Sequence, residues 1–236
     1  MRRLVVLALA VLPLVACSGE HGQRAQQLLT SAEAAHARLS SASFEAKVAF
    51  SLDGRRFGLV MDGGGYFKGR RAGDSVFSLR ADGFPGAGSF NMQGVVRRGQ
   101  LSVTLNGQRF FVPARASTEQ QLDWSGTMLD LARYVKNVRV LEGRVVNGER
   151  GATIAGVIDT KELLKAVAKL DTLTRAAKLD DFDGKIGDIH AAVFVATRTG
   201  LIRSAAVNMK LDVEGKKMAI DFTYRMKSAN KAVAGL

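Results

Sequence analysis

The stretch that decides the fold is residues 189–226, IHAAVFVATRTGLIRSAAVNMKLDVEGKKMAIDFTYRM. Three runs of alternating apolar and polar residues occur in it, separated by turns at Gly200 and Gly215. Alternation with a period of two is typical of a β-strand that buries one face, and glycine favours tight turns between antiparallel strands. The stretch therefore predicts three long antiparallel strands in a row.

The same alternation continues through the earlier chain. Asp53-Gly54 and Asn106-Gly107 are hairpin turn signals, and the glycine run at 63–65 predicts a bulge or a bend. Tight turns between strands favour one antiparallel sheet over parallel βαβ units, and a sheet of about eleven strands is wide enough to curl. The earlier strands are expected at residues 44–52, 57–67, 75–81, 89–96, 100–105, 108–112, 138–146 and 152–158.

Three segments have helical spacing of their apolar residues, at about 24–39, 117–135 and 160–173. The second is apolar over a wide arc, which must be buried against another layer. The concave face of a curled sheet is the surface available for this. The predicted fold class is therefore α+β, with a single curved antiparallel sheet, a half-barrel of about eleven strands, and helices packed on its concave face.

The N-terminal segment has the pattern of a secretory signal peptide. Arg2 and Arg3 precede an apolar run of thirteen residues, Leu4–Ala16, which is too short for a membrane span of about 20 residues. The chain's only cysteine, Cys17, follows directly. A single cysteine forms no internal disulfide, so the secreted fold must rely on its core.

Leu14-Val15-Ala16-Cys17 resembles the bacterial lipobox. The resemblance implies that the signal is cut before Cys17 and that this cysteine is acylated with palmitate-type chains. It implies a signal peptide at 1–16, a lipidated tether at 17–23, a folded domain at 24–227 and a frayed basic tail at 228–236. Two or three acyl chains anchor a protein stably, so we expect a location on the extracytoplasmic face of the cell membrane. An ordinary signal peptide with an incidental cysteine is the alternative.

The mature chain resembles the LppX/LprG group of mycobacterial-type lipoproteins, which share a fold with the periplasmic carrier LolA. The resemblance rests on the lipobox, on LLTSAEAAHARLSSASFEAKVAFSL at 28–52 and on VATRTGLIRSAAVNMKL at 195–211. It implies a half-barrel that is lined with apolar side chains, closed by helices and used to carry or transfer acylated lipids in the cell envelope.

An apolar cavity under the helices is the expected binding site. Acyl chains suit such a cavity because burying each CH₂ is worth about 0.8 kcal/mol. The candidate lining residues are Phe50, Leu59, Met61, Phe77, Leu79, Met92, Leu122, Trp124, Met128, Leu131, Leu163, Val167, Leu170, Val207, Met209, Ile220 and Phe222. For each of them, ordinary core packing is the competing interpretation.

The expected partners follow from the same features. They are an acylated lipid or glycolipid, the outer leaflet of the cytoplasmic membrane through the Cys17 anchor, and a membrane transporter; we expect a monomer. The net charge of +12 comes from scattered Lys and Arg without interleaved aromatics, so no nucleic-acid partner is expected. Headgroup contacts near the cavity mouth are expected from Arg55, Arg56, Lys68, Arg70 and Arg71, with solvated turn charges as the alternative.

Catalytic signals are lacking in the sequence. His21, His36 and His190 have no metal-binding spacing, and Asp188 and His190 have no nucleophile motif beside them. The acidic stretch LDDFDGKIGD at 179–188 lacks EF-hand ligands at the first and last loop positions. No catalytic residue, metal or cofactor is expected. The main alternative function is a LolA-like sensor or binding module that regulates a membrane partner without lipid transport; a structural envelope lipoprotein is another.

Overall fold

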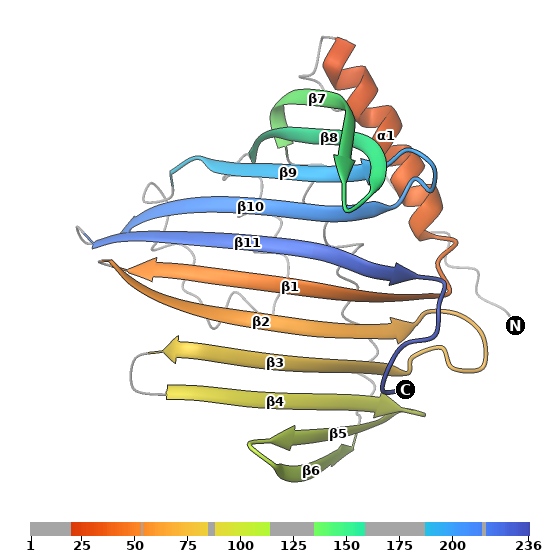
Figure 1. The fold of residues 1–236 in the computed structure, drawn as a ribbon, viewed down its shortest axis with the longest axis vertical. Coiled ribbons are helices and arrows are strands. Elements are labelled where there is room, and N and C mark those ends of the chain that lie inside the picture. Colours follow the sequence, from red (N-terminus) through yellow and green to blue (C-terminus); the bar gives the residue numbers. More distant parts are fainter. Residues whose placement is uncertain (1–19, 53, 85–87, 114–134, 159–186, 214–215) are drawn as a thin grey trace, which may run out of the picture.

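The computed structural model describes residues 20–52, 54–84, 88–113, 135–158, 187–213 and 216–236. Within them the chain forms one helix and eleven strands (Figure 1). The bounds are α1 Glu20–His36, β1 Ser41–Leu52, β2 Arg55–Tyr66, β3 Ser75–Phe84, β4 Gly88–Arg97, β5 Gln100–Leu105, β6 Gln108–Pro113, β7 Val135–Val146, β8 Glu149–Ile158, β9 Ile189–Ala196, β10 Ile202–Val213 and β11 Lys216–Ala229.

All eleven strands belong to one open, curved antiparallel sheet in the order β6-β5-β4-β3-β2-β1-β11-β10-β9-β8-β7 (Figure 1). Each strand pairs with its neighbour in the sequence, except where β1 pairs with β11 in the middle of the sheet. The two ends of the folded chain therefore meet at the centre, and β6 and β7 are the edges. The predicted fold class is confirmed, including the meander of β9, β10 and β11.

The helix differs in its bounds from the prediction. It begins at Glu20, within the expected tether, and ends at His36 rather than near Leu39. The predicted helices at 117–135 and 160–173 lie outside the described residues, apart from Val135. That residue starts β7 and is buried opposite Ile158, so its place on a helical face is wrong. An apolar β-branched residue fits both periods, and here the cross-strand partner decides.

Strand β7 bends over the end of the sheet beside α1 (Figure 1). Two register irregularities in its pairing with β8 coincide with positive φ angles, 51° at Asn137 and 67° at Gly143. Such bulges bend a strand and increase its twist. An ion pair of 2.6 Å between Arg24 and Glu142 then joins α1 to the bent strand.

The core lies between α1 and the β7 half of the sheet. Ala25, Leu28, Leu29 and Ala32 follow helical spacing and pack in one cluster with buried strand residues such as Ile154. The β9–β10 turn fits closely under the helix at Gly200. Its φ is +70°, and a Cβ there would lie 3.1 Å from the side chains of Ser31 and Ala35. This turn therefore requires glycine on both conformational and packing grounds.

The glycine run at 63–65 is a regular part of β2, so the predicted bulge is wrong. Its three residues pair in register with both β1 and β3. Close packing explains the glycines instead. A Cβ on Gly63 would lie 2.7 Å from the Phe44 ring, and one on Gly64 would lie 2.8 Å from the Val233 side chain.

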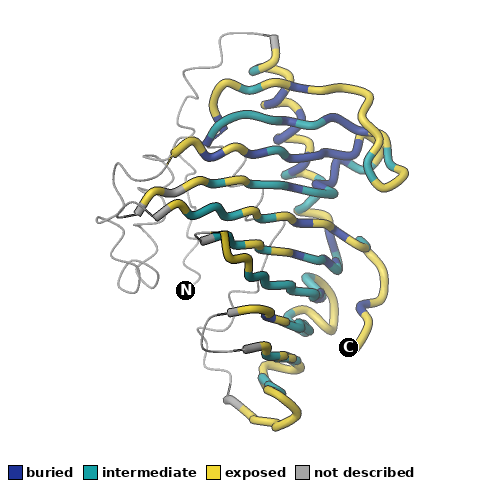
Figure 2. The backbone as a smooth tube through the Cα atoms, turned by 60° about the vertical axis from the view of Figure 1, so that its left-hand side comes forward, coloured by how far each residue is buried: buried dark blue, intermediate teal, exposed yellow. Residues whose placement is uncertain are grey.

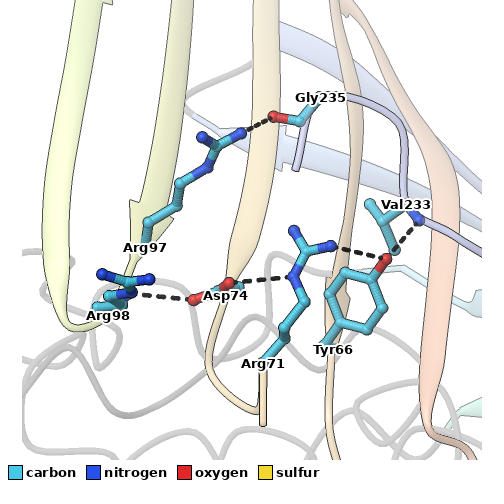
Figure 3. Close-up of polar contacts among 7 residues, drawn as sticks. All are labelled: Tyr66, Arg71, Asp74, Arg97, Arg98, Val233 and Gly235. Carbon is cyan, nitrogen blue, oxygen red and sulfur yellow. Dashed lines mark hydrogen bonds and ion pairs between the residues drawn. The ribbon is translucent and has the colours of Figure 1, made fainter.

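The C-terminal residues are docked on the sheet, so the expectation of a frayed tail is also wrong. The Asn230 N–H donates to Ser41 O at 2.8 Å, and the Val233 N–H donates to the Tyr66 hydroxyl at 3.1 Å. Arg97 donates to the Gly235 carbonyl at 2.9 Å (Figure 3). Val233 is buried, since the missing side chain of Gly64 leaves room for it.

Candidate functional site

One face of the sheet, the face on which α1 packs, is apolar from one edge of the sheet almost to the other; we call it the inner face. Strand register aligns its side chains in rows that cross the strands. One row crosses ten neighbouring strands without a polar residue: Val140, Ile154, Val193, Ala205, Tyr224, Ala46, Met61, Leu79, Met92 and Leu105. The opposite, outer face carries mostly polar residues in β1, β10 and β11.

The two ends of this row differ in burial, and Figure 2 shows the more deeply buried strands at the α1 end of the sheet. From Val140 to Ala46 every member is at most 7% exposed, because α1 and the bent β7 cover that part of the face. Met61, Leu79 and Met92 are half-buried, and Leu105 is 40% exposed. The inner face thus has a close-packed region near β7–β9 and a half-buried apolar region over β1–β4 and the far ends of β10 and β11.

Ten of the seventeen predicted lining residues lie within the described part of the chain. Strand register places all ten on the inner face, and each is half-buried rather than buried. They are Phe50, Leu59, Met61, Phe77, Leu79, Met92, Val207, Met209, Ile220 and Phe222. The other seven, Leu122, Trp124, Met128, Leu131, Leu163, Val167 and Leu170, lie outside the described residues, as does Cys17.

Aromatic rings on the inner face pack over glycines or against one another. The ring of Phe44 covers Gly63, and the ring of Phe77 covers Gly94, where a Cβ would lie 2.1 Å from the ring. Phe50 and Phe57 form a stacked cross-strand pair with centroids 5.4 Å apart. These rings add large apolar area to the face, which suits contact with hydrocarbon.

The outer face is held by charge pairs. Lys227 bridges Glu45, at 3.6 Å, and Asp62, which stand opposite each other on β1 and β2. A hydrogen bond from Lys47, strengthened by the nearby Lys227 charge, holds the pKa of Glu45 below its ordinary value. The hydrogen bond to Asp62 raises the pKa of Lys227. Lys227 is the extra residue at the β1–β11 register shift, and a bulge of this kind redirects a side chain.

The predicted basic cluster is not brought together. Arg55 and Arg56 lie at one end of β2, whereas Lys68, Arg70 and Arg71 follow its other end, roughly 35 Å away at about 3.3 Å per residue. Lys68 and Arg71 also have structural contacts of their own. Lys68 Nζ donates to Ala37 O, and Arg71 lies over the Tyr66 ring and beside Asp74 (Figure 3). These five residues do not form one headgroup site.

The described ranges hold no cluster of three or more His, Cys, Asp or Glu side chains placed to bind a metal. His190 and Asp188 are both exposed, at the start of β9. Within the described part of the chain, no helix combines the length and apolar character that crossing a membrane requires.

The prediction missed several members of the inner face. Val48, Phe90, Val103 and Phe110 extend its rows. Alternation in the sequence could have located Val48 and Val103. The register that aligns them across strands arises only when the sheet forms, so their common surface has no local signal.

Known structures share this fold. LprF from Mycobacterium bovis is similar over 90% of this chain and 95% of its own, with a TM-score of 0.54 and 15% identity. The lipoprotein LppX from Mycobacterium tuberculosis matches over 89% of this chain and 97% of its own, with a TM-score of 0.49 and 13% identity. No protein-family model and no curated protein matches the sequence. The resemblance predicted from the sequence is thus confirmed at the level of the fold: the chain folds like LprF.

Proposed function

We propose that this protein is a lipid-anchored, non-enzymatic lipoprotein that binds the acyl chains of lipids on its inner face and carries them in the cell envelope. The observation that carries this proposal is the half-buried apolar region that spans β1–β4 and the far ends of β10 and β11. Contiguous apolar surface of this kind marks a binding site on a soluble domain.

The chemistry of the region suits acyl chains. Its side chains are aliphatic, aromatic and methionine, and those of Met61, Met92 and Met209 are flexible enough to adapt to different ligands. A methylene that leaves a membrane for water costs about 0.8 kcal/mol, and burial on this face instead of in water avoids that cost. The likeness to LprF and the lipobox at Cys17 agree with a lipoprotein at a membrane surface.

Native mass spectrometry of the freshly purified protein tests binding directly. We expect adducts with the mass of acylated lipids, which disappear on delipidation and return on incubation with phospholipid vesicles. A protein that neither retains nor reloads lipid would rule out the carrier and leave the regulatory binding module as the better proposal.

Two adjacent residues of β2 provide a matched pair of variants. Leu59 points to the inner face and Val60 to the outer face, where it stands opposite Lys47 and Arg80. We expect Leu59→Glu to abolish lipid adducts, because a carboxylate in the apolar region repels acyl chains. Val60→Glu places the same charge beside two cations and should leave the adducts unchanged. Equal loss in both variants would contradict binding on the inner face.

Transfer is tested separately with a fluorescent phospholipid that is quenched in donor vesicles. We expect the protein to accelerate its movement to acceptor vesicles, and Leu59→Glu to be inactive. Lipid binding without any acceleration would support a lipid-binding protein and exclude a carrier between membranes.

A further inference from the structure

A cleft separate from the inner-face region lies at the end of the sheet where β8 and β10 begin and β9 and β11 end. It is a cleft of about 740 Å³ between the C-terminal half of α1, the β9–β10 turn and the end of β11. The inner-face residues proposed to bind acyl chains are not among its lining residues. We call it the turn cleft.

The turn cleft is strongly basic. Its lining includes Arg38, Arg198, Arg203 and Lys231, against one carboxylate, Glu149, so its described lining carries a net charge of +3. Hydroxyl groups from α1 and from the turn complete its polar wall. Like charges gathered in one cleft are unfavourable without a ligand, since each raises the local potential felt by the others.

The backbone around Arg203 aims its side chain into the turn cleft. Arg203 is the extra residue where the β9–β10 register shifts, between Ile202 and Ser204. Its Nε donates to Glu149 at 2.9 Å, and its side chain is 17% exposed. This pair neutralises the only carboxylate of the described lining, so the remaining cations face the cleft without an acidic partner in that lining.

Contacts of neighbouring groups position the segments that carry the other cations. The Arg38 side chain donates from Nε to Ala34 O at 3.0 Å. The Lys231 carbonyl accepts from the Ser41 hydroxyl at 2.7 Å. Gly200 packs against Ser31 and thereby fixes the turn that carries Arg198.

We propose that the turn cleft binds the phosphate group of an organic anion. Guanidinium groups bind phosphate through paired N–H donors, and lysine and hydroxyl groups add single hydrogen bonds. The cavity is far larger than a bare phosphate ion and has the size of sites for small organic ligands. Leu39 and Leu201 give part of its wall an apolar character. The anion is either a phospholipid headgroup or a soluble phosphate ester, and both present the same group to the cleft.

Calorimetric titration of the full chain tests this proposal with three probes: inorganic phosphate, glycerol 3-phosphate, and dihexanoyl phosphatidic acid below its micelle concentration. Arg198→Ala with Lys231→Ala removes two exposed cations of the cleft. Lys210→Ala with Lys217→Ala removes the same charge from exposed positions toward the opposite ends of β10 and β11. Equal melting temperatures of the variants establish that both are folded.

We expect at least one phosphate probe to bind the wild type and the Lys210/Lys217 variant equally, and the cleft variant at least tenfold more weakly. Preference for dihexanoyl phosphatidic acid identifies a headgroup, and preference for glycerol 3-phosphate identifies a soluble ester. Absence of binding by every probe overturns the proposal. So does binding of inorganic phosphate alone, or equal weakening in both variants. Leu59→Glu leaves the turn cleft intact, so failure here is distinguishable from failure of lipid binding on the inner face.

Discussion

At the scale of single residues, Gly64 shows how a missing side chain shapes this protein. It lies near the end of β2, where it pairs with Ser43 and Val76. Its backbone angles are ones that any strand residue can adopt. However, the Val233 side chain and the Ala42 carbonyl occupy the space that a Cβ would need. The glycine is therefore required by a contact with the distant C-terminus.

Gly64→Ala should destabilise the fold by about 1–3 kcal/mol, the usual cost of overpacking. Its Cβ would lie 2.7 Å from a backbone oxygen, which cannot move as a side chain can. Gly58→Ala, in the same strand, is the control, because its Cβ would meet only an atom at 3.7 Å. Urea unfolding of both variants measures the difference. Equal stability of the two would contradict the packing explanation.

Cys17 is the residue that we propose carries the acyl chains of a membrane anchor. We expect Cys17→Ala to abolish incorporation of labelled palmitate and to move the protein from the membrane fraction to the soluble fraction. Cell fractionation with and without detergent measures both. Continued labelling of the variant would contradict acylation at Cys17, whereas retention without labelling would point to an uncleaved signal peptide as the anchor.

At the scale of elements, two bulges place charges that join neighbouring strands. Arg203 leaves the regular register of β10 to reach Glu149 on β8, and Lys227 leaves that of β11 to reach Glu45 and Asp62. These partners are 54 or more positions apart in the sequence. Strand pairing therefore creates both networks.

Lys227→Met should cost about 1 kcal/mol at neutral pH, because Asp62 then faces Glu45 without the cation that bridges them, and only Lys47 still pairs with Glu45. The lowered pKa of Glu45 means that its contribution is present above the unfolded-state pKa and is lost as the pH falls through the folded-state value. The raised pKa of Lys227 means that its contribution is lost as the pH rises through its own folded-state value.

The difference in unfolding free energy between wild type and Lys227→Met should therefore be largest near neutral pH. It should shrink toward roughly pH 3, where most carboxylates are protonated. Urea unfolding at both pH values measures it. Lys210→Met is the control, since Lys210 is exposed and has no ion pair with a described residue. A difference that is constant with pH would contradict an electrostatic origin.

The docked C-terminus also joins separate elements, because its hydrogen bonds connect it to β1, β2 and β4 on the outer face. Val233→Ser should destabilise the protein by roughly 1–2 kcal/mol through loss of buried apolar area. Ala232→Ser, at an exposed neighbouring position, should have little effect. Thermal unfolding and carboxypeptidase digestion measure the change. Equal digestion of both variants would contradict the docked tail.

At the scale of the whole molecule, an open sheet of eleven strands presents a wide apolar face. Within the described chain, only one part of this face is tightly covered, where α1 packs on it. Burial decreases from Ile154, at 1% exposed, to Leu105, at 40%. A ligand that binds the half-buried region adds its binding free energy to the stability of the folded state.

Reloading the delipidated protein from phosphatidylglycerol vesicles should raise its melting temperature. At a free ligand concentration about 100 times Kd, the gain of about 2.7 kcal/mol corresponds to roughly 5–10 °C for a chain of this length. Leu59→Glu should show no such rise, and Val60→Glu should show the full rise. Differential scanning calorimetry measures all three, and an unchanged wild-type melting temperature would contradict lipid binding.

By itself, the sequence determined the strands, their antiparallel order and the apolar face, because period-two alternation and turn glycines act over a few residues. It also placed ten of the proposed lining residues on this face, since each lies in an alternating run, and their role in lipid binding stays a prediction. Only the tertiary structure decided what depends on distant partners. The in-register glycine run, the docked tail, the strand identity of Val135 and the turn cleft all arise from contacts between segments far apart in the chain. Local sequence patterns do not specify such contacts, which form only when distant strands and segments come together in the fold.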